Sequence, residues 1–201
     1  MPLAPQTSAP YERTKSAATR LVLDAASELD TVVAAPSGVF GPFDFKRSEV
    51  GTGIRQWMER PSTVMLPGGY DFVDVRDVAE GLRLVLEQGR RGQVYLLGNE
   101  WIEMAEMARQ VMHQTHGRAK VTLIPLFMAH SLAKVALWDS KRRGVRPVLT
   151  PYTLETLMAP YRLDWSKART ELGFTVRPIS QTVKDTVKWW QENWEAGGGR
   201  R

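Results

Sequence analysis

The feature that most constrains the fold is a short apolar run, residues 31–35 (TVVAA), without alternation between apolar and polar side chains. Such a run is typical of a parallel strand covered on both faces. It follows a segment, Tyr11 to about Leu29, whose apolar residues recur at helical spacing. A loop with two glycines and two prolines comes next, from Pro36 to Pro42. A helix, a buried strand and a loop in this order are typical of a doubly wound α/β sheet, where ligands bind beyond the carboxyl ends of the strands.

The remaining elements show that such a sheet is incomplete in this chain. The patterns predict helices at 49–59, from Asp74 or Asp77 to Gly89, and at 102–116, 126–142, 166–172 and 180–194. They also predict strands at 94–97 and 121–124 and an extended piece at 72–73. Two buried parallel strands and one accessory strand are fewer than such sheets usually have. The expected fold class is therefore α/β, an incomplete doubly wound parallel sheet that lacks its N-terminal strands.

Composition excludes several classes of protein. With 201 residues, 43% hydrophobic and 24% charged, the chain has enough length for one core or two small ones. It contains no cysteine, which excludes disulfides and thiolate metal sites and favours a cytoplasmic location. No signal peptide and no apolar run of the ~18 residues that span a bilayer are visible, so we expect no integral membrane segment.

The positive charge of the chain does not indicate nucleic-acid binding. The formal net charge is +5, and much of the excess lies in residues 141–146 and in Arg200 and Arg201. No aromatic side chains are interleaved with these basic residues to stack on bases. We therefore expect a small-molecule ligand and no nucleic acid.

The segment YERTK places Tyr11 and Lys15 four residues apart. Four residues are about one helical turn, so both side chains would lie on one face, with the ammonium close to the phenol. A free phenol titrates near pH ~10, and a neighbouring positive charge favours the phenolate. This arrangement is typical of a general acid, although the bare motif is also typical of a solvated helix start.

Five segments taken in order carry a family resemblance: YERTK, APSGVFGP, GGYDFVDVRDVAEG, GQVYLLGNE and LDWSKARTELGF, before a tryptophan-rich last helix. The chain resembles the extended short-chain dehydrogenase/reductase superfamily from about residue 10 to residue 194. Within it, the chain is most similar to the dihydroflavonol 4-reductase-like branch. The resemblance implies a Rossmann-like sheet, a mostly helical substrate-binding lobe, and NAD or NADP as cofactor.

The resemblance also implies roles for individual residues. Tyr11 is expected to be the catalytic acid/base, and Lys15 is expected to hold the nicotinamide ribose and to assist ionisation of the phenol. The loop that lies against the nicotinamide ring is expected to consist of Pro36, Ser37, Gly38 and Val39. Residues 72–77 match the segment after the substrate-binding helix, from which Val73 and Arg76 are expected to line the substrate cleft.

Two features of the family pattern are missing from this sequence. None of the 16 glycines forms the GxGxxG or GxxGxxG turn on which a cofactor pyrophosphate rests. Thr7 and Ser8 are too close to Tyr11 to be the catalytic serine or threonine of the family. The chain thus resembles a carboxyl-terminal portion: 1–41 as a remnant of the dinucleotide-binding domain, 42–195 as a lobe interleaved with a last Rossmann strand at about 93–99, and 196–201 as a disordered tail.

Three functional hypotheses remain open on the sequence. The first is an NAD(P)-dependent oxidoreductase of the extended short-chain type, acting on a small-molecule ketone, aldehyde or hydroxyl group, and inactive as this chain alone. The second is a nucleotide-sugar epimerase or dehydratase of the same superfamily. The third is a non-enzymatic interaction protein derived from it, whose exposed strand edge at 31–35 pairs with a partner. A homo-oligomer or a missing N-terminal segment would complete the sheet.

Two further patterns have simpler interpretations. The apolar residues of 126–142, followed by Lys141, Arg142 and Arg143, fit peripheral membrane binding, but a helix packed on the core fits better because polar residues interrupt the run. His113 and His116 form an HxxH pattern on a helix without a third ligand. No metal site is expected.

Overall fold

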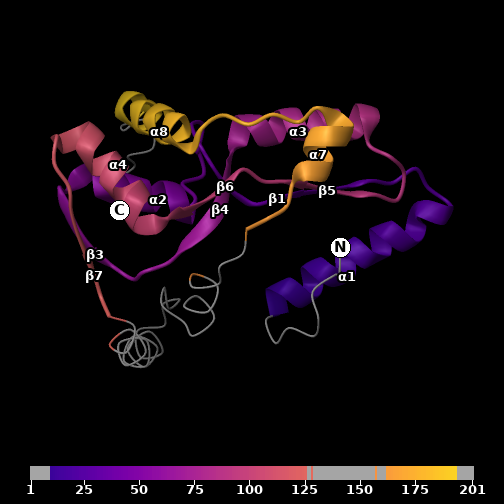
Figure 1. Cartoon of the computed structure of the whole chain (residues 1–201), viewed down its shortest axis with the longest axis horizontal. Helices are drawn as coiled ribbons and strands as arrows, with labels where there is room; N and C mark the ends of the chain where they lie inside the picture. Colours follow the sequence, from indigo (N-terminus) through magenta and orange to yellow (C-terminus); the bar gives the residue numbers. More distant parts are fainter. Residues whose placement is uncertain (1–9, 126–127, 129–156, 158–161, 194–201) are drawn as a thin grey trace. The chain divides into compact units, whose positions relative to one another are not determined.

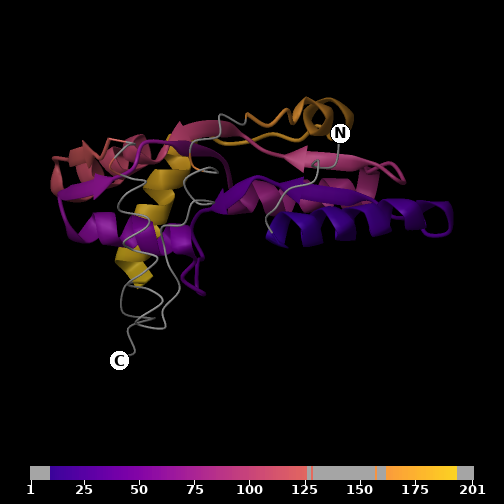
Figure 2. The same cartoon turned by 90° about the horizontal axis from the view of Figure 1, so that it is seen from below.

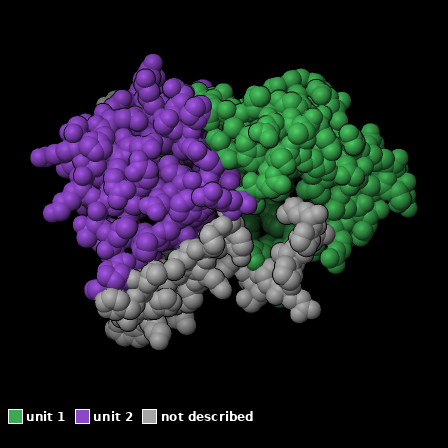
Figure 3. Space-filling view, viewed as in Figure 1, with its two compact units in different colours: residues 1–39, 73–99, 163–177 green, residues 40–72, 100–162, 178–201 purple. Residues whose placement is uncertain are grey.

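The computed structural model describes residues 10–125, 128, 157 and 162–193 (Figure 1). The chain forms two compact units, shown in different colours in Figure 3. Unit 1 consists of residues 1–39, 73–99 and 163–177, and unit 2 of 40–72, 100–162 and 178–201. Each unit has a hydrophobic core of its own. The sequence placed 73–92 and 163–177 in the substrate-binding lobe, whereas here both segments contribute apolar side chains to the core of unit 1.

The centre of unit 1 is a parallel pair of strands, β1 (Val33–Pro36) and β5 (Val94–Leu97). Val33 lies opposite Val94, and Pro36 lies opposite Leu97. Figure 1 shows α1 (Pro10–Asp24) on one side of this pair and α3 (Val75–Gln88) on the other. A helix on each side of a parallel pair is the Rossmann-like arrangement that the sequence predicted.

Capping residues define the helices of unit 1. The 3-10 turn η1 (Ala25–Ser27) closes α1. Asp74 begins α3, since its carboxylate accepts a hydrogen bond of 2.8 Å from the amide of Arg76, and Gly89 ends it. Gly173, at φ 66°, ends α7 (Ser166–Leu172), which packs on α3 and β5.

Unit 2 is built on three helices, α2 (Glu49–Glu59), α4 (Met104–His116) and α8 (Ile179–Asn193). Helix α8 packs on both of the others (Figures 1 and 2). Ser48 caps α2 by accepting a hydrogen bond of 3.0 Å from the amide of Gly51. The core of this unit is apolar and aromatic: Phe40, Ile54, Trp57, Met58, Phe72, Ile102, Met107, Ala108, Val111, Met112, Ile179, Val183, Val187, Trp189 and Trp190.

Further short strands lie mostly in unit 2, although residues 38–39 of one strand and 73–74 of another belong to unit 1. β3 (Ser62–Met65) pairs in parallel with β7 (Lys120–Leu123). β4 (Gly69–Asp74) pairs antiparallel with β6 (Glu100–Glu103), in a sheet of order β2-β4-β6 that includes β2 (Gly38–Phe40).

Several sequence predictions differ from the structure at these strands. The predicted loop 36–42 contains β2, and β3 and β6 were not predicted. The helix expected from 102 begins at Met104, because residues 100–103 pair with β4. Strands of three or four residues lack enough alternation to be recognised, and their partners lie far away in the chain. The predicted helix 126–142, apart from Met128, and the tail 196–201 lie outside the described residues.

Among the residues that the structure describes, no helix is both long and apolar enough to cross a membrane.

Candidate active site

The predicted acid/base pair lies on the first turns of α1. Tyr11 is 67% exposed, and the Nζ of Lys15 lies over the Tyr11 ring, 5.7 Å from its centroid. The Oγ1 of Thr14 donates a hydrogen bond of 2.8 Å to the carbonyl oxygen of Tyr11, which steadies this turn. The helix thus brings the ammonium and the phenol ring together as the four-residue spacing predicted.

Lys15 also lines a cavity of about 500 Å³ within unit 1. The wall on the α1 side consists of Lys15, Ser16, Thr19 and Leu23. The opposite wall is mostly apolar and comes from β1 and β5: Val33, Ala35, Val94 and Leu96. Ala35 immediately precedes the predicted cofactor loop. The cavity runs along β1 and β5 and includes Ala35, near the carboxyl end of β1, the end at which parallel sheets bind ligands.

Two charged residues line the same cavity, Asp164 just before α7 and Lys167 in its first turn. Hydrogen bonds from the hydroxyl and the amide of Ser166 lower the pKa of Asp164, whose carboxylate is therefore ionised at neutral pH. The Nζ of Lys167 donates to the side-chain oxygen of Gln93 at 2.6 Å and lies 4.7 Å from the centroid of the Tyr95 ring. The cavity thus has charged groups of both signs along an apolar wall.

The predicted cofactor loop begins where β1 ends. The amide of Ser37 donates a hydrogen bond of 3.1 Å to the carbonyl oxygen of Leu97, which holds the loop against β5. The Oγ of Ser37 is buried and has no hydrogen-bond partner among the described residues. A buried hydroxyl without a partner is costly, so a ligand that offers one would bind favourably. Pro36 is exposed, and Gly38 and Val39 are half-buried.

These groups fit one end of a dinucleotide. The Lys15 ammonium and the apolar wall of the cavity suit the ribose and the ring of a nicotinamide, whereas Ser37 belongs to the loop that follows β1 and does not line this cavity. The pyrophosphate of a dinucleotide needs backbone N–H groups at a glycine-rich turn before a helix, and this sequence has no such turn.

The two predicted substrate residues differ in their surroundings. Val73 has 0% exposure and packs in the core of unit 1. Arg76 is partly exposed, with its Nε and Nη2 donating to the carboxylate of Asp74 at 2.9 and 2.7 Å. Their places in a substrate cleft stay predictions.

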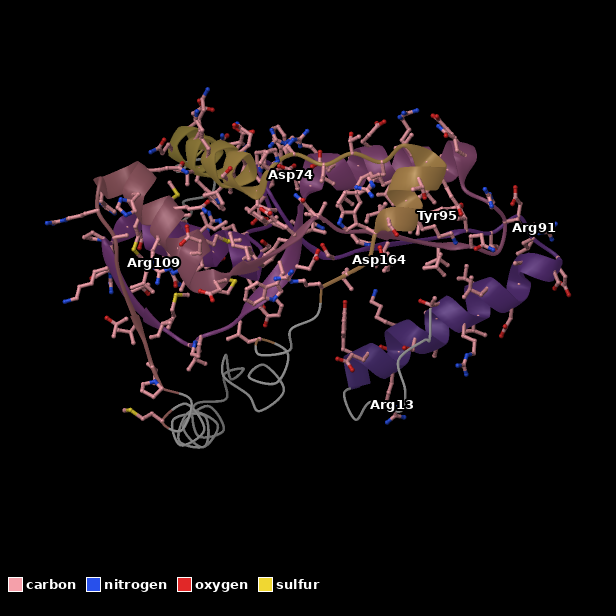
Figure 4. The ribbon with its side chains drawn as sticks, in the orientation of Figure 1. Arg13, Asp74, Arg91, Tyr95, Arg109 and Asp164 are labelled. Atoms are coloured by element: carbon pink, nitrogen blue, oxygen red, sulfur yellow. The ribbon has the colours of Figure 1, made fainter. Side chains whose placement is uncertain are left out.

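Arg76 belongs to a buried ion network that sequence reasoning missed. Asp74 has 0% exposure and also accepts a hydrogen bond of 2.8 Å from Nη1 of Arg177. Asp77 accepts a hydrogen bond of 2.9 Å from the amide of Arg177 and forms an ion pair with its guanidinium at 3.2 Å. From residues 74–77 the sequence predicted a helix cap and, by resemblance, a substrate contact at Arg76, but no ion network. Arg177 is about a hundred residues away in the chain, and no spacing rule could connect it to this site (Figure 4 labels Asp74 at the start of α3).

Comparison with known proteins bears on the family and the fold. Residues 1–98, just under half of the chain, match the NAD dependent epimerase/dehydratase family. Over these residues the chain is similar to members of that family. The resemblance to extended short-chain dehydrogenases/reductases is thereby confirmed, as is the α/β, Rossmann-like fold class.

Three relatives illustrate the match. The chain is 30% identical to sterol demethylase protein B of Methylococcus capsulatus, over 90% of this chain and 56% of that protein. It is 29% identical to a putative dihydroflavonol 4-reductase of Synechocystis, over 91% of this chain and 55% of that protein. The crystal structure of a nucleoside-diphosphate-sugar epimerase from Pseudomonas aeruginosa superposes with a TM-score of 0.73 at 26% identity, covering 94% of this chain and 57% of that one. The chain thus spans about half the length of these relatives.

Proposed function

We propose that this chain carries the acid/base pair and the nicotinamide end of the cofactor site of an NAD(P)-dependent reductase that acts on a small-molecule carbonyl. The observation that carries the proposal is the position of Lys15, which lies next to the Tyr11 ring and lines a cavity along β1 and β5 that includes Ala35, the residue before the predicted cofactor loop. The chain is 30% and 29% identical to the sterol demethylase and reductase relatives, compared with 26% to the epimerase structure. This difference in identity supports a reductase over an epimerase.

Each residue of the pair has a separate task in this proposal. The phenol of Tyr11 donates a proton to the oxygen of the carbonyl substrate as that oxygen gains negative charge. Lys15 holds the ribose hydroxyls, and its ammonium stabilises the phenolate that remains. The hydroxyl of Ser37 supplies a hydrogen bond to the nicotinamide carboxamide. When bound, the cofactor supplies the hydride.

A fusion protein tests the chemistry. In it, this chain replaces the aligned carboxyl-terminal part of the Synechocystis relative, and NADPH oxidation is measured with a panel of ketones and aldehydes. We expect turnover that Tyr11→Phe lowers by about 100-fold or more, because the proton donor is removed. The matched control is Arg13→Gln, which changes an exposed residue on the same helix (Figure 4). A folded fusion that binds NADPH but shows no dependence on Tyr11 contradicts the proposal.

The second candidate is a nucleotide-sugar epimerase, favoured by the structural likeness to the Pseudomonas aeruginosa epimerase. An epimerase returns the hydride that it takes, so the cofactor shows no net consumption. Interconversion of sugar nucleotides by the same fusion without NADPH oxidation would favour this candidate.

A further inference from the structure

A cavity of about 750 Å³ lies within unit 2 and includes none of the residues of the candidate active site. Its first wall is the C-terminal turn of α2, with Gln56, Trp57, Glu59 and Arg60. Its second wall comes from β3 and β7. Cavities of roughly 300–1,000 Å³ are typical of small-molecule sites. The size of this cavity therefore suits a small ligand.

The pairing of β3 with β7 gives the second wall a polar surface. Ser62 lies opposite Lys120, and Val64 lies opposite Thr122. Side chains alternate between the two faces of a strand, so these four share one face, and all of them are exposed. Val121, at an alternate position, packs against the core of unit 2. The face that lines the cavity is thus the face that the core leaves uncovered.

Three hydroxyl groups line this cavity, those of Ser62, Thr63 and Thr122. Within the described ranges, none of these three hydroxyls has a hydrogen-bond partner in the protein. A hydroxyl can donate one hydrogen bond and accept others. The cavity thus offers three donors to a ligand that is rich in oxygen.

The charge along the two walls is positive. Arg60 and Lys120 line the cavity, and neither forms an ion pair in the described part of the chain. The carboxylate of Glu59, which also lines it, is paired with the guanidinium of Arg55 at 3.6 Å. Arg118 is exposed, two residues before Lys120, and has the same sign. The segments of the two walls therefore hold four cations and one carboxylate, and that carboxylate has a cation of its own.

Two cations beside hydroxyl groups suit a phosphate. A phosphate group carries a charge of about −1.5 to −2 at pH 7 and has three acceptor oxygens, so it can bind a guanidinium, an ammonium and a hydroxyl at once. A carboxylate has a single charge and would leave one cation without a partner. The aromatic residue of the described lining, Trp57, is 8% exposed and displays no ring on which the bases of a nucleic acid could stack.

We propose that this cavity binds a small molecule through a phosphate group. Arg60 and Lys120 hold the phosphate oxygens, and the hydroxyls of Ser62 and Thr122 donate further hydrogen bonds. The rest of the cavity accommodates the organic part of the ligand. The proposal is independent of the proposed reductase function, because unit 2 supplies every residue that it uses.

Nuclear magnetic resonance titration of the full chain with glycerol phosphate, at constant ionic strength, tests the proposal. We expect saturable shifts of the backbone amides of Ser62, Lys120 and Thr122, with a dissociation constant on the order of millimolar. Inorganic phosphate should shift the same amides, and glycerol should not. Arg60→Gln and Lys120→Gln should each weaken binding of glycerol phosphate about tenfold, because each removes a charge-assisted hydrogen bond.

Lys46→Gln is the matched control. It removes the same charge from an exposed residue before the other end of α2, and it should leave the dissociation constant unchanged. Circular dichroism checks that each variant is folded. Wild-type protein without saturable shifts at these amides overturns the proposal. An equal loss of binding in all three variants would show attraction by net charge alone and also overturns it. Equal shifts with glycerol and with glycerol phosphate would contradict the phosphate contact.

Discussion

Helix α1 in unit 1 and helix α8 in unit 2 have the same length and similar spacing of apolar residues. They differ in how far these residues are buried. Each has 15 residues with an apolar stripe. Helix α8 buries seven of them: Ile179, Thr182, Val183, Thr186, Val187, Trp189 and Trp190. None of residues 11–24 of α1 is buried, and Leu21 is 71% exposed. A periodic pattern thus predicts an apolar face but does not say whether that face is covered.

The difference corresponds to a division of roles. Helix α8 packs on α2 and α4 in the core of its unit. Helix α1 carries the Tyr11 and Lys15 side chains and lines a cavity with Lys15, Ser16, Thr19 and Leu23. Stability in the described structure is expected to depend on α8, and ligand binding on α1.

The largest expected loss of stability comes from a substitution in the core of unit 2. Trp190 is 3% exposed, so Trp190→Ala should lower the free energy of unfolding by about 3–5 kcal/mol. Leu21→Ala on α1 should change it by less than about 0.5 kcal/mol, because the side chain is already hydrated. Urea denaturation of the two variants measures this contrast. Equal losses would show that α1 is packed as tightly as α8.

A second prediction concerns the ion network of unit 1. Asp74→Ala removes a helix cap and the carboxylate that the guanidinium groups of Arg76 and Arg177 share. Because both arginines are partly exposed, we expect a loss of about 3 kcal/mol, at the low end for a broken buried ion pair. Glu80→Ala, on the solvated face of α3, breaks only an exposed pair with Arg83 and should leave the melting temperature unchanged. A similar small effect for Asp74→Ala would contradict a stabilising role of the network.

Two glycines of unit 2 should respond in opposite directions. A Cβ at Gly69 would collide with the backbone carbonyl of Ile102 on the paired strand, so Gly69→Ala should cost about 1–3 kcal/mol. Gly53 lies inside α2, and a Cβ added there would meet no atom of another segment within 4 Å, so Gly53→Ala should stabilise the protein by about 0.5–1 kcal/mol. Thermal unfolding of both variants checks the signs.

The smallest expected effect is a pH dependence in unit 2. Burial, with a contribution from Glu49, raises the pKa of Tyr70 above the ordinary value of 10.0. The folded state therefore holds this proton longer than the unfolded state, and stability decreases as pH rises above 10.0, with no contribution well below it. Tyr70→Phe should make this decrease shallower. Identical pH profiles for the two proteins would show that the phenol is not desolvated.

The local helices and strands could be predicted from the sequence, but the contacts between residues far apart in the chain could not. The bounds of α2 and β5 agree with the prediction, because apolar periodicity, a serine cap and a buried run define them locally. The pairing of β4 with β6 and the bonds from Arg177 to Asp74 and Asp77 could not be predicted, since each joins residues far apart in the chain. The closeness of Lys15 to the Tyr11 ring could be predicted because one helical turn links the two residues. The unpaired hydroxyl of Ser37 became apparent only from its burial.

The central claim is that the chain binds the nicotinamide end of a cofactor through Lys15 without a cradle for the pyrophosphate. Nuclear magnetic resonance titrations with NADPH and with nicotinamide mononucleotide, on wild type and Lys15→Ala, test it most directly. We expect similar weak affinities for both ligands, on the order of millimolar, and loss of both in the variant. Micromolar binding of NADPH that far exceeds binding of the mononucleotide, or binding unchanged by Lys15→Ala, would contradict the claim.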